Sequence, residues 1–339
     1  MISQKLIAEK AGLSYATVSR AFTQNARVRP ETMQKIKNAM RELGIHNSDN
    51  LFLGRGSLSK MVLVVVGDLS SEFYSGIVSG IHDGLARFGY SISLCISGFR
   101  ADVELSNMDA AVETGFTGII MITAVETDNM IDFLHNCKIP VVLVNRYIRF
   151  LDMDVVRIDN YRGGYQAAEH LVENGHKRIA HLGGQQNSAT THDRLRGFSD
   201  ALADHGIDFG SKDIVYGDLK RSSGRAFAVK LIEEGYTAAF IGNDYMTVGA
   251  AYQLINSGKS IPQDVSLICF DDSPIISEDG LMISSVSCDA RMMGESTADV
   301  LIKRLNDLLG DRIRIILSPR LLIRNSVKRL GADDHMAPE

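Results

Sequence analysis

From residue 61 onward, short apolar runs alternate with longer amphipathic stretches, and this alternation constrains the fold more than any other feature. A run of four to eight apolar residues is typical of a strand buried on both faces, whereas apolar residues at three- and four-residue spacing are typical of a helix. Strands that alternate with crossover helices form parallel sheets covered by helices on both faces. We therefore expect an α/β architecture for this part of the chain.

The alternation occurs in two successive sets, which predicts a core at 61–329 made of two similar parallel-sheet subdomains. Expected helices lie at 75–88, 103–114 and 128–135 in the first set, and at 161–174, 194–205 and 245–257 in the second. Ligands of open α/β sheets bind beyond the carboxyl ends of the strands. The polar residues that follow the expected strands are therefore candidate ligand contacts: Asp68, Asn145, the loop after Gly183, Asn243, Asp244, Asp271 and Asp272.

The charge of the chain is divided unevenly between its first sixty residues and the rest. Residues 1–60 hold ten Lys or Arg and four acids, a net charge of +6. Because the net charge of the whole chain is −5, the remaining residues carry −11. A small basic unit joined to a large acidic one is typical of a phosphate-binding module attached to a domain that binds something else. This distribution indicates nucleic acid as the partner of the N-terminal unit.

Three short helices are predicted in this basic unit. Ser3 can cap a helix over 4–11 with Leu6, Ile7, Ala8 and Ala11 as its apolar face, Gly12 ends it, and Ser14 caps a second helix over 15–22. A third helix over 30–43 starts at Pro30 and ends before Gly44. The first two helices, joined by three residues, have helix-turn-helix spacing, in which outward residues of the second helix read bases in the major groove. Here those residues are Tyr15, Ala16 and Arg20.

The alternative to a DNA-binding headpiece is that these residues form a basic helical appendage that binds another protein.

The string AEKAGLSYATVSRAF at 8–22, followed by RVRPET at 27–32 and RELG at 41–44, resembles the headpiece of the lactose-repressor/galactose-repressor family. The resemblance implies a headpiece at 1–45 and a hinge at 46–60. It also implies that Tyr15, Ala16 and Arg20 read operator bases and that Ser14, Thr17, Ser19 and Asn25 lie near the DNA backbone. Arg29 replaces the usual capping Ser and adds a possible phosphate contact.

The hinge departs from the family pattern. In the family, this segment inserts a leucine wedge into the minor groove. Residues 46–56 lack the usual Pro and the usual leucine order, and Gly54 occupies the wedge position. Leu51 and Leu53 are the nearby candidates for the wedge, so either the register differs or the kink is weaker. Packing of these leucines against the core is the alternative.

The larger part of the chain resembles the core of the same family, which is similar to periplasmic sugar-binding proteins. The matching segments lie in order at 68–74, 158–164, 176–184, 194–198, 243–250, 261–272 and 324–326. The resemblance implies subdomain N at about 61–158 and 288–317, subdomain C at about 159–287 and 318–329, and a flexible tail at 330–339. Carried over by position, the residues expected to bind a small effector are Phe73, Tyr74, Asn145, Thr190, Arg194, Leu219, Asn243 and Asp271.

The chemistry of these residues suits a carbohydrate, because an Arg fork and a carboxylate bind vicinal hydroxyls while apolar faces cover a ring. A nucleobase or sugar phosphate is the alternative effector. Leu219 replaces an aromatic residue common in relatives, and Glu72 replaces a common Pro. The expected function is a sequence-specific transcription regulator, a repressor, that binds a near-palindromic DNA operator as a homodimer and responds to this effector.

Other classes of protein are less consistent with the sequence. A phosphate loop ending in Gly258-Lys259-Ser260 fails because Gln253 stands where a Gly is required. His170, His176 and His181 lack metal-ligand spacing, and no nucleophile elbow is present, so we expect no enzyme, no metal and no cofactor.

The cysteines favour a reducing compartment, because Cys95, Cys137, Cys269 and Cys288 form no CxxC pair. The N-terminal residues lack an export signal and no run approaches the ~20 apolar residues of a membrane helix. We therefore expect a cytoplasmic, nucleoid-associated protein rather than an exported sugar-binding protein.

Overall fold

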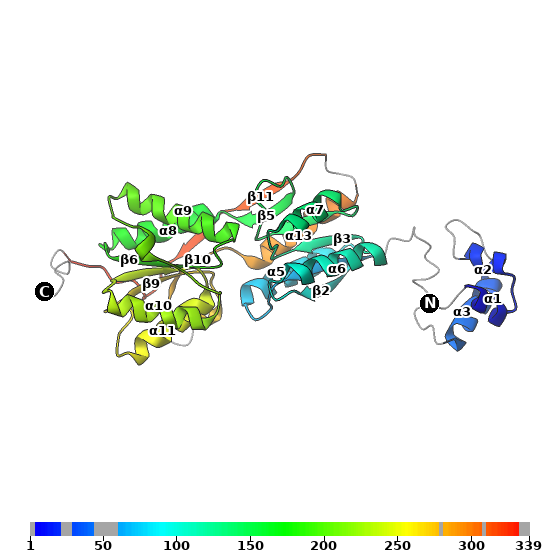
Figure 1. The fold of residues 1–339 in the computed structure, drawn as a ribbon, viewed down its shortest axis with the longest axis horizontal. Helices are drawn as coiled ribbons and strands as arrows, with labels where there is room; N and C mark the ends of the chain where they lie inside the picture. The colour runs from blue at the N-terminus through cyan, green and yellow to red at the C-terminus, as the bar shows by residue number, and fades with distance from the viewer. Residues whose placement is uncertain (1–3, 22–28, 44–59, 278–280, 307–309, 332–339) are drawn as a thin grey trace.

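The structure is a computed structural model that describes residues 4–21, 29–43, 60–277, 281–306 and 310–331. The expected fold class is confirmed: a small all-α headpiece is followed by an α/β core with two sheets (Figure 1). In the part of the chain that is described, none of the helices is both long and apolar enough to span a bilayer.

The headpiece consists of α1 (Gln4–Ala11), α2 (Tyr15–Ala21) and α3 (Pro30–Glu42) around one small apolar centre. The turn between α1 and α2 uses Gly12 in the left-handed region, at φ 64°, where residues with a Cβ are disfavoured. The centre is formed by side chains from all three helices: Ile7, Ala8, Val18, Ala21, Ile36 and Met40. Leu6 was expected on the apolar face, but its side chain is 44% exposed, because Ile7 and Ala8 take the inward positions.

Subdomain N is built on a six-stranded, all-parallel sheet of order β11-β5-β4-β3-β1-β2. Its strands are β1 (Met61–Val66), β2 (Ser91–Ile96), β3 (Gly118–Met121), β4 (Val141–Val144), β5 (Asp154–Ile158) and β11 (Arg314–Leu317). The helices that accompany it are α5 (Glu72–Ala86), α6 (Ala101–Thr114), α7 (Asp128–Asn136) and α13 (Ala290–Leu305). The central strands β3 and β4 are buried along their whole length, as expected for a sheet covered on both faces.

Subdomain C repeats this plan around a sheet of order β12-β10-β9-β8-β6-β7, in which only β12 runs antiparallel to its neighbour. Its strands are β6 (Ile179–Gly183), β7 (Ile214–Tyr216), β8 (Ala238–Ile241), β9 (Ser266–Phe270), β10 (Ser284–Ser287) and β12 (Arg320–Leu322). Its helices are α8 (Asn160–Glu173), α9 (Ala189–Asp204), η1 (Ser211–Asp213), α10 (Arg221–Glu233), α11 (Asp244–Asn256) and α12 (Pro274–Ser277).

The two subdomains are linked by three passages of the described chain: from β5 to α8, from β10 to α13, and from β11 to β12 (Figure 1). A core divided between two sheets and connected in this way can change the angle between them without unfolding either. The residue boundaries of the subdomains stay a prediction.

Glycines bring α8 and α9 unusually close together. A Cβ on Gly164 of α8 would lie 2.0 Å from the carbonyl oxygen of Arg194, and one on Gly197 of α9 would lie 1.9 Å from that of Tyr161. Each glycine therefore admits the backbone of the opposite helix. This packing fixes the position of α9, the helix that carries Arg194.

Candidate functional site

Helix α2 presents its predicted reading face outward. Tyr15 is 53% exposed, Ala16 and Arg20 are also exposed, and Arg20 Nε donates to the Ala16 carbonyl at 3.2 Å. On the opposite side of the helix, Val18 is fully buried in the headpiece centre. The helix is thus held by one face while the other remains available to a partner.

The residues predicted to lie near the DNA backbone differ in how they are used. Ser14 Oγ accepts the Thr17 amide at 3.1 Å and lies 2.8 Å from the Thr17 hydroxyl, so it caps α2. Ser19 is half-buried, and Arg29, at the start of α3, is exposed. The predicted contacts Asn25, Leu51 and Leu53, together with the hinge at 46–59, lie outside the described residues.

In subdomain N the predicted effector residues lie at the carboxyl edge of the sheet. Asn145 directly follows β4 at φ 65°, its amide donates to the Val156 carbonyl at 2.8 Å, and its side chain is 4% exposed. Its Oδ1 has no hydrogen-bond partner among the described residues. Phe73 and Tyr74 are half-buried in the first turn of α5, with ring centroids 5.9 Å apart. This edge therefore offers one unsatisfied acceptor beside two aromatic rings.

In subdomain C, Asp271 occupies the matching position after β9. It has φ 72°, its amide donates to the Val286 carbonyl at 2.9 Å, and its Oδ1 has no partner within the described ranges. Burial raises the pKa of Asp271 to about 7, against the opposing effect of the Arg194 charge. At neutral pH this carboxyl can therefore accept or donate a hydrogen bond.

Arg194 is held rigidly in the same cleft. Its Nε donates to Asn160 Oδ1 at 2.8 Å, its Nη1 donates to the Gly242 carbonyl at 2.6 Å, and its guanidinium lies 3.4 Å from the centre of the Phe270 ring. Two directional bonds and a stacking contact fix the plane of the fork. Tyr74 of the opposite subdomain feels the charges of both Arg194 and Asp271, so the structure brings these three residues together.

The other three predicted effector residues have local partners. Thr190 lies in the first turn of α9, and its hydroxyl is 2.8 Å from Ser188 Oγ. Asn243 caps α11, because its Oδ1 accepts the Met246 amide at 3.0 Å and its Nδ2 donates to the Leu219 carbonyl at 3.2 Å. Leu219, at φ 66°, packs against the core of subdomain C. Their contribution to ligand contact remains a prediction.

Sequence reasoning missed residues that also belong to the cleft. Arg146 is only 6% exposed and lines a pocket between the subdomains together with Tyr147, Ser188 and Ala189. Arg146 immediately follows Asn145, so extending the search for polar strand-end residues by one position would have found it.

Direct contacts between the subdomains hold the cleft closed. The Tyr147 hydroxyl of subdomain N donates to Asp193 Oδ2 of subdomain C at 2.9 Å, and Arg157 Nη1 of subdomain N lies 3.6 Å from the same oxygen. The Tyr245 hydroxyl of subdomain C donates to the Ser70 carbonyl at 2.7 Å. The pocket lined by Arg146 has a volume of about 10 Å³, which is room for one water molecule. A sugar-sized ligand could therefore enter this pocket only if the subdomains moved apart or its side chains rearranged.

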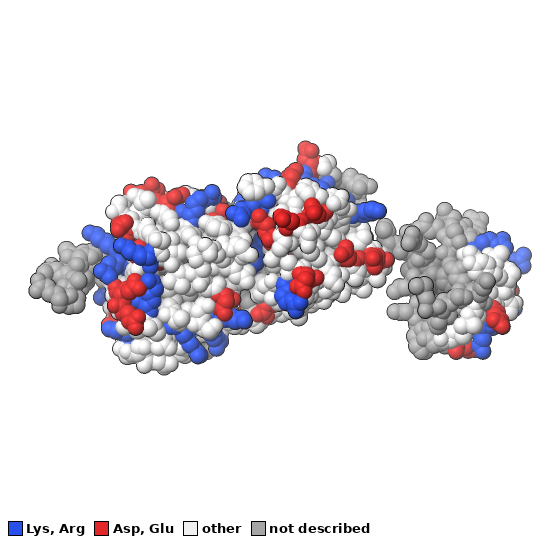
Figure 2. Space-filling view, viewed as in Figure 1, with Lys and Arg blue, Asp and Glu red and all other residues white. Residues whose placement is uncertain are grey.

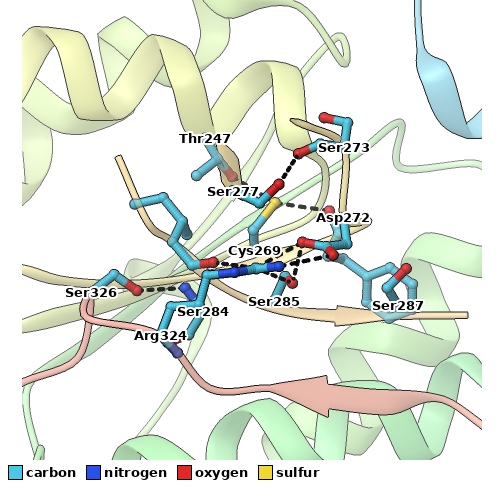
Figure 3. A network of polar contacts seen from close by, with 12 residues as sticks. Thr247, Cys269, Asp272, Ser273, Ser277, Ser284, Ser285, Ser287, Arg324 and Ser326 are labelled. Carbon is cyan, nitrogen blue, oxygen red and sulfur yellow. Dashed lines mark hydrogen bonds and ion pairs between the residues drawn. The ribbon is translucent and has the colours of Figure 1, made fainter. Parts of the chain in front are cut away.

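Asp272, another strand-end candidate, is committed to the framework rather than to the cleft. Arg324 Nη1 donates to Asp272 Oδ1 at 2.7 Å, and its Nη2 donates to Asp272 Oδ2 at 3.0 Å (Figure 3). Ser285 Oγ donates to the same carboxylate at 2.8 Å, and the Ser284 amide donates to Ser326 Oγ at 2.7 Å. This network joins β9, β10 and the segment after β12, and it holds the backbone next to Asp271.

On the face shown in Figure 2, acidic and basic side chains are interspersed over the core. A mixed surface of this kind produces little net attraction for a polyanion. In the described part of the chain, no three His, Cys, Asp or Glu side chains are grouped so that they could hold a metal ion.

Comparisons with known proteins cover both parts of the chain. Residues 5–48 match the model of the bacterial regulatory proteins of the lacI family, and residues 59–325 match that of the periplasmic binding proteins and sugar-binding domain of the LacI family.

Individual relatives match along nearly the whole length. The HTH-type transcriptional regulator DegA of Bacillus subtilis is 26% identical, with 96% of this chain and 98% of DegA covered. The HTH-type transcriptional regulator CelR of Thermobifida fusca is 28% identical, with 95% and 97% covered. A solved transcriptional regulator CelR–cellobiose complex has a TM-score of 0.74 at 27% identity, with 96% of this chain and 100% of that chain covered. The chain therefore belongs to the LacI family of bacterial regulatory proteins.

Proposed function

We propose that this chain is a sequence-specific DNA-binding transcription regulator, a repressor, whose affinity for its operator is controlled by a polyhydroxylated small molecule bound between subdomains N and C. The observation that carries the proposal is the pair of unsatisfied acceptors, Asn145 Oδ1 and Asp271 Oδ1, that belong to opposite subdomains and accompany the Arg194 fork. Acceptors from both sides favour a ligand that carries hydroxyl donors on both of its edges.

For the DNA-binding step, we assign base contacts to Tyr15, Ala16 and Arg20 on the exposed face of α2. An arginine at this place can reach the acceptor edge of guanine with two hydrogen bonds, which discriminates between bases as well as adding affinity. One headpiece reads too few base pairs to be selective in a genome. We therefore propose a homodimer on a near-palindromic operator.

For the effector step, the class of ligand is a carbohydrate or a derivative of one. Arg194 would hold vicinal hydroxyls with its remaining donors, and the Tyr74 and Phe73 rings would cover an apolar face. The related CelR structure is a complex with cellobiose, which supports a saccharide here. Leu219 offers no aromatic platform on which the ring of a sugar or a nucleobase could stack.

Control of DNA binding requires that the ligand bind one cleft geometry more tightly than another. The Tyr147–Asp193 and Tyr245–Ser70 hydrogen bonds exist only while the subdomains are closed. A ligand that alters the closure would therefore alter the angle between subdomains. That change would reposition the two headpieces of a dimer relative to successive major grooves.

The proposal is tested by selecting binding sites for the full-length protein from a random duplex pool and measuring affinity for the selected and scrambled duplexes. We expect a two-fold-related consensus. Arg20→Ala should reduce the ratio of specific to nonspecific affinity by about 5- to 150-fold, because one bidentate base contact is worth about 1–3 kcal/mol. Lys10→Ala is the matched control, since it removes a headpiece cation whose Nζ pairs with Glu42 at 3.1 Å. Selection of no consensus would contradict sequence-specific binding.

A further inference from the structure

Two arginines from opposite subdomains lie in the cleft, one buried and the other half-buried. Arg146 is 6% exposed at the end of β4, and Arg194 is fixed on α9 by its bonds to Asn160 and Gly242. Burial lowers the pKa of Arg194, and the positive charge of Arg146 acts in the same direction, so the two guanidinium groups lie close enough to interact. A guanidinium stays protonated even when buried, so both positive charges persist at neutral pH.

Among the described residues, neither arginine forms an ion pair with a carboxylate. Arg194 donates to a neutral amide and a neutral carbonyl, while the Arg146 guanidinium lies 5.3 Å from the centre of the Phe99 ring and near the Tyr74 hydroxyl. Across the described ranges, no carboxylate oxygen lies within 4 Å of either guanidinium. Buried charges in proteins are normally paired, because an unpaired one is costly to remove from water.

Other half-buried arginines among the described residues follow that rule. Arg304, whose side chain is 15% exposed, forms an ion pair with Asp154 at 2.7 Å, and Arg324, whose side chain is 16% exposed, forms one with Asp272 at 2.7 Å. The fold therefore supplies carboxylates where an arginine serves the framework. The two cleft arginines are exceptions, and both lie where the predicted ligand binds.

The carboxyl groups nearest to the cleft compensate these charges only in part. Burial raises the pKa of Asp271 to about 7 and that of Glu104 to about 7, so each is partly protonated at neutral pH. Both oxygens of Glu104 already accept bonds, from Ser97 Oγ and the Val125 amide. Glu126, which lines the pocket, is paired with Arg149 at 3.5 Å.

The start of α9 adds a second positive feature on the other side of the pocket. This 16-residue helix begins at Ala189, and Ser188 gives it no side-chain cap, because the Ser188 hydroxyl bonds to Thr190 instead. Ser188 and Ala189 line the same pocket as Arg146. An uncapped helix start that faces a buried guanidinium is a favourable place for an anionic group.

We propose that the effector is a polyhydroxylated acid, a sugar carboxylate or sugar phosphate, whose anionic group binds between Arg146 and the first turn of α9 while its hydroxyls reach Asn145 and Asp271. This inference rests on the proposed effector function. It narrows the class of effector from carbohydrates in general to acidic carbohydrates, as distinct from neutral sugars with the same ring. Arg146 is then the residue that determines specificity for charge.

The test compares ligands of matched ring and different charge on the full-length protein by isothermal titration calorimetry. The probes are D-glucose, D-glucuronate and D-glucose 6-phosphate, and the corresponding galactose series. We expect an acid or a phosphate to bind at least tenfold more tightly than its neutral parent, since a hydrogen bond to a charged group is worth about tenfold to a hundredfold in affinity. The carboxylate and phosphate arms identify which anion is used.

Variants then locate the effect. Arg146→Gln should reduce the affinity for the preferred acid to that of the neutral parent, and Arg146→Lys should restore part of it. Lys138→Gln is the control, because Lys138 precedes β4 whereas Arg146 follows it, so the same charge is removed at the far end of the strand. The native-protein comparison stands even if a variant fails to fold.

The outcomes separate the two proposals. A neutral sugar that binds as tightly as its acid, or more tightly, would overturn the acidic effector while leaving effector control intact. If no member of either series binds, both the acidic effector and the proposed saccharide control are overturned. An acid preference that Arg146→Gln leaves unchanged would overturn the placement of the anion.

Discussion

Replacing Arg194 by Met should abolish the response to the effector while leaving DNA binding intact. A guanidinium carries five N–H donors, of which Arg194 uses one toward Asn160 and one toward Gly242, so three remain for a ligand. If two of these bind the effector at about 1.5–3 kcal/mol each, their loss costs about 3–6 kcal/mol. The affinity should therefore fall by roughly 10²- to 10⁴-fold. Met retains apolar volume against the Phe270 ring, which limits disturbance of the core.

The assay is a fluorescence-anisotropy titration of a labelled operator, with and without effector. Arg178→Met is the matched control, because the Arg178 guanidinium likewise donates two hydrogen bonds, in its case to the backbone carbonyls of Glu234 and Gly235. Arg178 lies just before β6, at the end of the strand away from the cleft. Operator affinity measured without effector reports whether each variant is folded. An undiminished effector response in Arg194→Met would refute the assignment of this residue.

Three further predictions concern stability, pH and closure. Gly164→Ala should lower the urea midpoint, since its Cβ would lie 2.0 Å from a backbone oxygen of α9 and overpacking costs about 1–3 kcal/mol; an unchanged midpoint would mean that the helices can separate freely. Asp271, with a pKa raised to about 7, stabilises the fold most below its unfolded pKa of about 3.9 and loses that contribution as pH rises through 7. The free energy of unfolding should therefore fall less between pH 4 and 7 in Asp271→Asn than in the native protein. It should still fall in part, because the pKa of Glu104 is also raised to about 7. Equal slopes of unfolding free energy against pH in the two proteins would count against the raised pKa of Asp271. Tyr147→Phe removes the bond to Asp193, worth ~1.5 kcal/mol, so the cleft should open about tenfold more often and the radius of gyration in solution scattering should increase; an identical scattering profile would show that this bond does not hold the subdomains.

The strand and helix pattern of the core was predictable where a buried strand is a continuous apolar run, as in β1 and β8, but not at β10, whose sequence is SSVS. Elements without that signal were missed. Helix α10 (Arg221–Glu233) begins with polar residues and contains Gly224, and β7 has only three residues, so neither showed a clear period. The start of α9 at Ala189 was placed five residues late for the same reason, which hid the fact that Thr190 lies in its first turn.

The cleft was predictable in outline but not in detail. The rule that polar residues after buried strands lie at the ligand edge of a sheet placed Asn145 and Asp271 at the sheet edges, where the structure has them. The same rule also selected Asp272 as a candidate ligand contact. Only the antiparallel return of β12 beside β10 brings Arg324 to Asp272 and commits that carboxylate to the framework. The burial of Arg146 likewise depends on Phe99 and Tyr74, which come from distant parts of the chain and leave no local sequence signal.

The central claim is that one chain couples an operator-reading headpiece to an effector cleft, and the most direct test is the reciprocity of the two affinities. Once a stabilising effector is found, its dissociation constant should be measured with and without the selected operator, and the operator's with and without the effector. We predict that both change by one common factor, about 5- to 150-fold, because linked binding equilibria are reciprocal. An effector that binds in the cleft and leaves operator affinity unchanged would contradict the account.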